Sequence, residues 1–397
     1  MRKTSLFFFA AVLLSVALAI PATAQPRQRL VSPEVNKDGT VTFRFRDIKA
    51  RSVSVRGDFD RSTAAPTTYS MTEGEGGVWT VTTPSLEPEI YQYSFIVDGQ
   101  PRLDPVNPFV TTENLLVASR FIVSKEMGDL GDLMTVHDVP HGTISEVWYW
   151  SPKLGMNRHM RVYTPAGYSA TGKKRYPVMY LCHGGGQDEN FWQEGGRTVQ
   201  IMDNLLAAGK AEPMIVVMAN GNAGRPASTV DSPVDVEPIP FAYGDTKKGI
   251  DFVFPDVISY VDANYKTIAK KEGRAMCGLS MGGFQTFYFT IDHPEVIGYI
   301  GLFSPGALPD WSDPTPAIDQ YKANPVIVDG LAGVFAAKPK LYWLGVGKLD
   351  GHRQDIYGLR DYLTEKGYPF TYLETEGPHE WTAFRRHLID FAQKIFK

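Results

Sequence analysis

The chain has 397 residues, of which 43% are hydrophobic, 12% aromatic and 21% charged. This balance is typical of a globular protein long enough for two domains, and it excludes disorder over most of the chain. Forty Lys and Arg residues against 44 Asp and Glu residues give a net charge of −4, without the basic excess of a nucleic-acid-binding protein.

Residues 1–24 have the pattern of a secretory signal peptide. A positive start at Arg2 and Lys3 is followed by an uncharged apolar run over 6–20 and by a small-residue cleavage pattern that ends at Ala24. The apolar run is shorter than the ~20 residues of a membrane-spanning helix. The sequence therefore predicts an exported protein, secreted or periplasmic, with no membrane association after cleavage.

Residues 25–125 are predicted to form a small, all-β sandwich. Short stretches of alternating apolar residues are separated by turn signals such as Asp98-Gly99. These stretches run over 40–46, 52–55, 78–83 and 90–97. In such a pattern the side chains of Trp79 and Tyr91 are more typical of a core than of a sugar-binding platform.

After a connector over 126–143, the segment 144–397 alternates apolar runs with helical patterns. Strands are expected over 147–150, 159–163, 177–182, 214–218, 275–277, 341–346 and 370–373, and helices over 198–208, 253–264, 283–292, 354–366 and 382–396. This order predicts a mostly parallel sheet with helices on both faces.

A Gly-x-Ser-x-Gly motif over 278–282 follows an expected strand and precedes an expected helix. In this context the chain turns sharply with Ser280 at the apex, and Gly278 and Gly282 leave room for the turn. The helix N-terminus behind the serine favours developing negative charge. The motif predicts that Ser280 is a nucleophile, and an ordinary turn serine is the alternative.

A serine hydroxyl needs a base, and in this strand–turn–helix class the acid and then the histidine follow the serine along the chain. Four histidines follow Ser280. His379 lies in a loop between the last expected strand and the last helix, which makes it the predicted base. His352 is the rival because it also follows a strand, whereas His293 is expected to cap a helix and His387 to be solvated.

Asp350 follows the strand expected over 341–346 and is predicted to hold the imidazole of His379 in one tautomer. Asp355 and Glu376 are the competitors for this role. The alternative for Asp350 is a plain turn residue, because Asp-Gly is a turn pair.

An oxyanion needs two backbone N–H donors. The first is expected from Met281, directly after the nucleophile. The second is expected from the glycine-rich loop after the strand that ends at Cys182, with Gly185 as the preferred donor and Gly184 in reserve. His183 is expected to brace this loop.

Together these motifs resemble the esterase D-type, carbohydrate esterase family 1 branch of the α/β-hydrolases. The matching segments are 181–186 with 189–192, 278–283, 347–350 and 377–381, within about 144–397. The resemblance implies an α/β-hydrolase fold, a triad of Ser280, Asp350 and His379, and oxyanion donors at Gly185 and Met281. Pro378 departs from the family pattern, in which a second Gly is common.

Residues 91–99 and 104–108 resemble the early-set immunoglobulin-like modules, to which carbohydrate-binding module family 48 belongs. The resemblance covers roughly 28–124. It implies an immunoglobulin-like sandwich ahead of a carbohydrate-active domain, and it leaves open whether this sandwich binds glycan.

The resemblances imply a serine carboxylesterase that hydrolyses feruloyl or acetyl esters on plant cell-wall xylan through an acyl-enzyme. Trp381 and Trp192 are expected to contact the polysaccharide-linked or oligosaccharide substrate, with simple packing of the site wall as the alternative. A siderophore trilactone esterase and a non-catalytic sugar-binding protein are the alternative functions.

Neither a cofactor nor a metal is expected, because the eight histidines show no H-E-x-x-H motif or His/Cys cluster. Cys182 and Cys277 are too few for a structural zinc site. They are expected to be buried thiols on neighbouring parallel strands, with their side chains near each other but without a disulfide.

Overall fold

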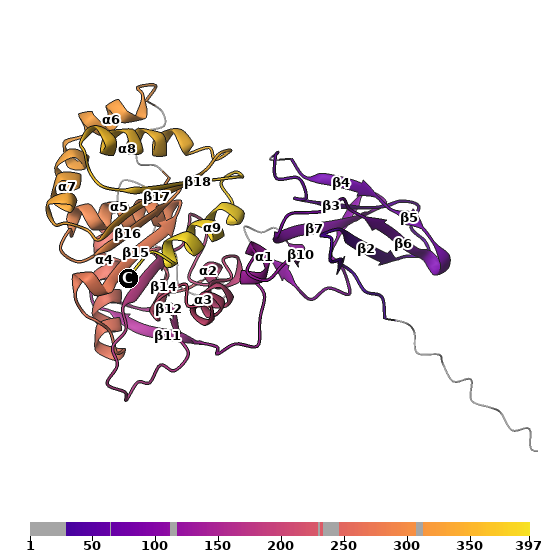
Figure 1. The fold of residues 1–397 in the computed structure, drawn as a ribbon, viewed down its shortest axis with the longest axis horizontal. Coiled ribbons are helices and arrows are strands. Elements are labelled where there is room, and N and C mark those ends of the chain that lie inside the picture. Colours follow the sequence, from indigo (N-terminus) through magenta and orange to yellow (C-terminus); the bar gives the residue numbers. More distant parts are fainter. Residues whose placement is uncertain (1–28, 64, 112–116, 229–230, 233–245, 307–312) are drawn as a thin grey trace, which may run out of the picture.

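The computed structural model of the protein describes residues 29–63, 65–111, 117–228, 231–232, 246–306 and 313–397 (Figure 1). The predicted signal peptide lies outside these residues. Among the helices of the described ranges, none combines the length and the apolar character that a membrane crossing requires.

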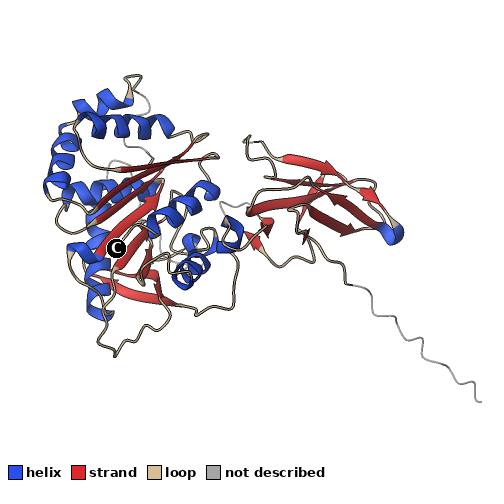
Figure 2. Ribbon diagram, in the orientation of Figure 1, coloured by secondary structure: helices blue, strands red, loops and turns tan. Residues whose placement is uncertain are grey.

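The N-terminal part is a sandwich of two antiparallel sheets (Figures 1 and 2). One sheet has the order β1-β2-β6-β5, and the other has the order β4-β3-β7-β10-β9 with β8 paired to β7. The strands are β1 (Glu34–Val35), β2 (Val41–Arg46), β3 (Val53–Gly57), β4 (Thr67–Ser70), β5 (Thr72–Glu73), β6 (Val78–Thr82), β7 (Glu89–Val97), β8 (Gln100–Arg102), β9 (Val110–Thr111) and β10 (Ala118–Val123).

The core between the two sandwich sheets is strongly aromatic, because alternate residues of each strand point inward. Phe43 contacts the rings of Tyr93 and Phe121 at centroid distances of 4.7 and 5.5 Å. Trp79 and Tyr91 are also buried in this core. Both side chains therefore stabilise the sandwich and present no sugar-binding platform, as the sequence pattern favoured.

The C-terminal part is built on an eight-stranded sheet with the order β11-β12-β14-β13-β15-β16-β17-β18. The strand β12 is antiparallel to both of its neighbours, and the strands from β14 to β18 are parallel. The bounds are β11 (Thr143–Ser151), β12 (Met156–Thr164), β13 (Val178–Cys182), β14 (Ile215–Ala219), β15 (Arg274–Leu279), β16 (Tyr299–Phe303), β17 (Leu341–Gly347) and β18 (Thr371–Thr375).

Helices cover both faces of this sheet, which confirms the predicted α/β class (Figure 2). Apolar residues of α4, α5, α7 and α8 form the core on one face, and those of α3 and α9 form the core on the other. The helices are α1 (Leu130–Leu133), α2 (Phe191–Glu194), α3 (Thr198–Ala207), α4 (Thr246–Asn264), α5 (Met281–Asp292), α6 (Ala317–Ala323), α7 (Pro325–Ala336), α8 (Arg353–Glu365) and α9 (Trp381–Ala392).

The two cysteines are free, buried thiols, but they do not lie side by side. The register places Cys277 opposite Leu181 and Cys182 opposite Gly278. Because successive residues of a strand point to opposite faces, each thiol enters a different core layer. The prediction of two buried thiols without a disulfide is therefore confirmed, and the one-residue offset in register turns their side chains to opposite faces of the sheet. Burial raises the pKa of Cys182 to about 12, so this thiol is unreactive.

A buried ion pair joins the two domains. Arg385 of α9 donates two hydrogen bonds to one carboxylate oxygen of Glu89 on β7, at 3.2 and 2.9 Å, and the two side chains are 4% and 0% exposed. The third guanidinium nitrogen donates to the carbonyl of Gly195 at 2.8 Å. Ile90 of the sandwich packs into the core of the C-terminal domain beside α9.

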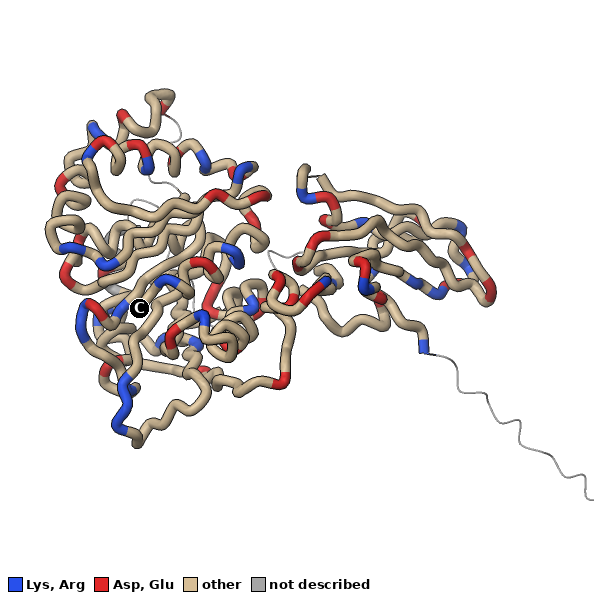
Figure 3. The backbone as a smooth tube through the Cα atoms, viewed as in Figure 1, with Lys and Arg blue, Asp and Glu red and all other residues tan. Residues whose placement is uncertain are grey.

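A second link lies at the start of α9. The guanidinium of Arg61 lies 3.3 Å from Glu380 of the C-terminal domain and 3.3 Å from Asp58 of the sandwich. It also donates a hydrogen bond of 2.6 Å to the carbonyl of Ile90. Figure 3 shows acidic and basic residues interspersed along both domains, so these links are specific pairs and do not arise from domains of opposite charge.

Removal of the Glu89 carboxylate would leave the Arg385 guanidinium buried without its counter-charge. Because such a loss costs about 3–5 kcal/mol, we expect Glu89→Ala to lower the free energy of unfolding by that amount in chemical denaturation. Glu73→Ala removes an exposed carboxylate from the same domain and should change stability by less than ~0.5 kcal/mol. Equal stability of the two variants would show that the ion pair does not stabilise the domain junction.

Candidate active site

The turn between β15 and α5 holds its apex residue in a strained conformation. Ser280 has φ 51° and ψ −116°, a region that residues other than glycine rarely adopt. Its N–H donates to the carbonyl of Phe303 at 3.0 Å, and its carbonyl accepts from the N–H of Gly306 at 3.2 Å. The neighbouring parallel strand and the loop after it therefore hold the serine in this conformation.

The two glycines of the motif are required by close packing against the end of β13. A Cβ atom on Gly278 would lie 2.7 Å from the carbonyl oxygen of Cys182, and one on Gly282 would lie 2.4 Å from the same atom. Both distances are shorter than a Cβ contact allows. The motif predicted from sequence thus has the strand–turn–helix geometry expected of it.

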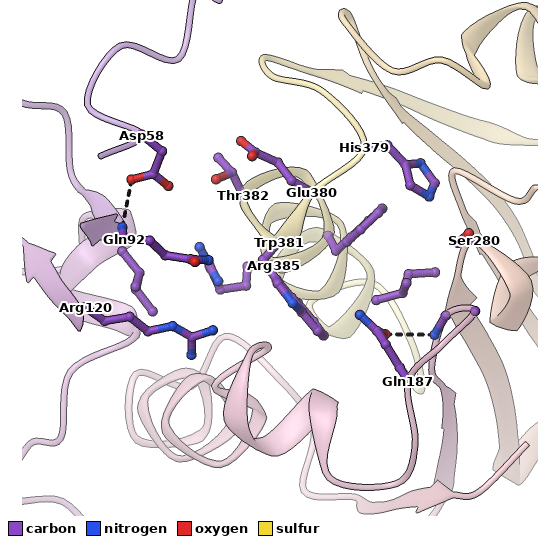
Figure 4. A pocket seen from close by; sticks show the side chains of 15 residues that line it. Asp58, Gln92, Arg120, Gln187, Ser280, His379, Glu380, Trp381, Thr382 and Arg385 are labelled. Carbon is purple, nitrogen blue, oxygen red and sulfur yellow. Dashed lines mark hydrogen bonds between the residues drawn. The ribbon is translucent and has the colours of Figure 1, made fainter. Parts of the chain in front are cut away.

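His379 and Asp350 are paired in front of this turn. His379 Nδ1 lies 2.8 Å from Oδ2 of Asp350, whose side chain is fully buried, and Oδ1 of Asp350 accepts the backbone N–H of His352 at 2.7 Å. Burial raises the pKa of Asp350, but the hydrogen bond and the positive charge of His379 outweigh it and hold the pKa below its ordinary value. In Figure 4 the imidazole of His379 lies next to Ser280.

The two competitors for the acid role have other partners. An oxygen of Asp355 lies 3.5 Å from Nδ1 of His352, and Glu376 forms a surface ion pair with Lys348. His352 itself lies edge-to-face against His379, with 4.7 Å between the ring centroids. The structure therefore brings His379 and Asp350 together and leaves His352 beside them.

Of the predictions for the two remaining histidines, one is confirmed and one is wrong. The N–H of His293 donates to the carbonyl of Phe289 at 2.9 Å, so this residue caps α5 as predicted. The prediction that His387 is solvated is wrong, because it is fully buried against Trp343 and Phe303. Burial lowers the pKa of His387 to about 3, which keeps this imidazole neutral.

Two glycines of the loop after β13, Gly184 and Gly185, line the cavity. The N–H of Gly184 already donates to Oε1 of Gln187 at 2.9 Å, which disfavours the reserve donor. Gly185 lines the cavity, and a Cβ atom there would meet no other atom within 4 Å. Met281 is the first residue of α5, where backbone N–H groups lack helical partners.

His183 braces this loop through both ring nitrogens. The N–H of Gly221 donates to Nε2 at 2.9 Å, so Nδ1 must carry the proton that is donated to the carbonyl of Gly184 at 2.9 Å. Burial lowers the pKa of His183, consistent with a neutral ring. The imidazole therefore fixes the loop and is not free for proton transfer.

A cavity of about 280 Å³ extends from Ser280 and His379 to the sandwich (Figure 4). Asp58, Gln92 and Arg120 of the sandwich line the end opposite to Ser280. The sequence did not reveal these three residues, because nothing in a strand pattern indicates which part of a sandwich faces a second domain.

The two tryptophans expected to contact substrate have different positions. Trp381 lines the cavity, with 5% of its surface exposed. Trp192 is 1% exposed, donates its indole N–H to the carbonyl of Cys182 at 2.8 Å and packs edge-on against Trp381. It therefore supports the wall from behind, which corrects the expected substrate contact.

Among the described residues, one group could offer three ligands to a metal ion: His159, Glu189 and Asp231. The carboxylate of Glu189 is 2.8 Å from His159 Nδ1 and accepts hydrogen bonds of 2.8 Å from Asn220 and from the N–H of Ser228. These bonds already satisfy the buried carboxylate. The group is also separate from the cavity that contains Ser280.

Comparison with known proteins agrees with this geometry. Residues 151–395 match the model of a family described as putative esterase. The chain belongs to this esterase family. Residues 31–109 match carbohydrate-binding module 48, the isoamylase N-terminal domain. The sandwich is thus a module of the type that the resemblance implied.

A curated relative of this esterase is an endo-1,4-beta-xylanase/feruloyl esterase of Xylanibacter ruminicola. The two are 32% identical over 386 residues, which cover 94% of this chain and 47% of the relative. The chain matches an esterase of Mycobacterium tuberculosis over 146 residues, at 34% identity and over 27% of that protein. The chain therefore spans about half the length of its first curated relative and less of the second.

Two solved structures are similar to the esterase. A carbohydrate esterase family 1 ferulic acid esterase of Anaeromyces mucronatus, in complex with ferulic acid, is 25% identical with a TM-score of 0.53, over 66% of this chain and 93% of that chain. The enterobactin esterase of Shigella flexneri is 17% identical with a TM-score of 0.60, over 89% of this chain and 92% of that chain. The second likeness shows a shared fold alone.

The pairing of His379 with Asp350 predicts which histidine variant loses more activity. We expect His379→Ala to lower kcat on a p-nitrophenyl ester by about 10⁴-fold or more, because the serine would lose its base. His352→Ala should lower kcat by less than about tenfold, since its imidazole lies beside the pair. The reverse ranking would assign the base to His352 and require a different acid.

Proposed function

We propose that the protein is an exported serine carboxylesterase that hydrolyses acyl esters, feruloyl above all, on plant cell-wall xylan. The observation that carries this proposal is the strained turn at Ser280, which faces a His379 held by the buried Asp350. The predicted signal peptide supports export. Acetyl esters are the second acyl class that the same chemistry would hydrolyse.

In the proposed mechanism, His379 Nε2 takes the proton of Ser280 as its Oγ attacks the ester carbonyl carbon. The negative oxygen of the tetrahedral intermediate accepts hydrogen bonds from the N–H groups of Gly185 and Met281. His379 then gives its proton to the departing alcohol. Water hydrolyses the resulting acyl-enzyme by the same steps, and Asp350 stabilises the imidazolium that forms each time.

The feruloyl assignment is supported by the names of the relatives. The Xylanibacter relative is named a feruloyl esterase, and the Anaeromyces structure contains ferulic acid. A trilactone esterase is the alternative because the enterobactin esterase shares the fold over both domains. The cavity lining carries two carboxylates, of Asp58 and Glu380, and two guanidiniums, of Arg120 and Arg385, so its charges do not distinguish the two substrate classes.

A substrate panel tests this proposal. We expect the purified chain to release ferulic acid from methyl ferulate and from feruloylated arabinoxylan, faster than it cleaves an iron-binding catecholate trilactone. Ser280→Ala should lower kcat on both ferulates by about 10⁴-fold or more and keep the wild-type circular dichroism spectrum. Cleavage of the trilactone alone, or full activity of Ser280→Ala, would contradict the proposal.

A further inference from the structure

The sandwich supplies one wall of the cavity that contains the nucleophile. Asp58 follows β3 directly, and Gln92 lies on β7, the central strand of the same sheet. Oδ1 of Asp58 accepts the backbone N–H of Gln92 at 2.7 Å, so the carboxylate and the amide side chain lie next to each other. Figure 4 shows both side chains at the end of the cavity opposite to Ser280.

This wall is held in place by the links between the domains. Gln92 is three residues along β7 from Glu89, which forms the buried pair with Arg385. Arg61 bridges Asp58 to Glu380, the residue directly after His379, with 3.3 Å to each carboxylate. The sandwich side of the cavity is therefore fixed relative to the His379 loop and is not carried on a loose tether.

The two ends of the cavity differ in chemistry. Near Ser280 the lining includes the apolar side chains of Leu279, Trp381 and Phe384, which suit a flat aromatic acyl group. The sandwich end carries the carboxylate of Asp58, the amide of Gln92 and the guanidinium of Arg120, with Ile90 as its apolar residue. Carboxylates accept hydrogen bonds and amides both donate and accept, which matches the donor and acceptor pattern of sugar hydroxyls.

The two sandwich groups differ in their existing partners: each oxygen of Asp58 has one, the N–H of Gln92 and the guanidinium of Arg61, and a carboxylate oxygen can accept a further hydrogen bond. Within the described part of the chain, the amide of Gln92 has no hydrogen-bond partner, while its backbone N–H is used by Asp58. Burial raises the pKa of Asp58 to about 6, with Arg61 acting in the opposite direction and Glu380 adding to the rise. At neutral pH the carboxylate is therefore mostly ionised and can accept hydrogen bonds from hydroxyl groups.

We propose that the N-terminal sandwich forms the leaving-group subsite of the esterase, in which Asp58 and Gln92 bind the hydroxyls of the sugar whose ester is cleaved. This inference rests on the proposed function and deepens it. It assigns recognition of the sugar alcohol to the sandwich and recognition of the acyl group to the hydrolase domain. The sandwich thus takes part in the reaction site itself.

Two substrates with the same acyl group and different alcohols test this assignment. We would measure kcat/KM for methyl ferulate and for feruloylated arabinose with the wild type, Gln92→Ala and Gln100→Ala. Gln92→Ala should lower kcat/KM on the sugar ester about threefold to tenfold, the effect of losing one or two hydrogen bonds, and change methyl ferulate less than about twofold. Gln100→Ala makes the same chemical change at an exposed position of β8 and should alter neither substrate.

Asp58→Asn is a second variant that keeps the shape of the side chain and should show the same selective loss on the sugar ester. Equal losses on both substrates would mean that the sandwich contacts the acyl group, and no loss on either would mean that it contacts no substrate. Either result overturns the assignment. If the wild type cleaves neither ferulate, the proposed acyl specificity fails, and the same comparison is made with methyl acetate and acetylated xylose.

Discussion

The arrangement of the whole molecule depends on the buried ion pair between Glu89 and Arg385. Two charges removed from water are stable only when they satisfy each other, so this pair holds the two domains in one relative position. Arg385 lies on the first turns of α9, directly after the loop that carries His379. Glu89 lies on the strand that carries Gln92. Together with the Arg61 link, this ion pair therefore positions the histidine loop and the sandwich wall of the same cavity.

The sequence predicted the parts of the site that depend on local chain geometry. Ser280 was identified because the turn from a parallel strand to a helix requires glycine at 278 and 282, and these glycines form a motif that can be recognised in the sequence. His379 and Asp350 were identified because they follow strand ends in a fixed order. The α/β class followed from alternating apolar runs and helical patterns. The strand β16 (Tyr299–Phe303), whose apolar run is interrupted by Gly301, was not predicted.

The rest of the site depends on contacts between distant residues, which no local pattern encodes. Glu89 and Arg385 are 296 positions apart, and nothing near either residue indicates the other. Contacts between distant residues also explain the wrong prediction for His387. The two arginines beside it indicated a solvated helix face. In the structure Arg385 faces the sandwich and His387 faces the core. The sugar-binding role proposed for Asp58 and Gln92 likewise became visible only when the two domains were seen together.

One ester substrate is expected to occupy both domains at once, and a crystal structure tests this most directly. Ser280→Ala would be crystallised with a feruloylated arabinose oligomer. We predict that the ester carbonyl oxygen lies about 2.7–3.1 Å from the N–H groups of Gly185 and Met281, with the arabinose hydroxyls bonded to Asp58 and Gln92. A ferulate ring at Gln92 with the sugar in solvent, or a ligand away from Ser280, would contradict the account.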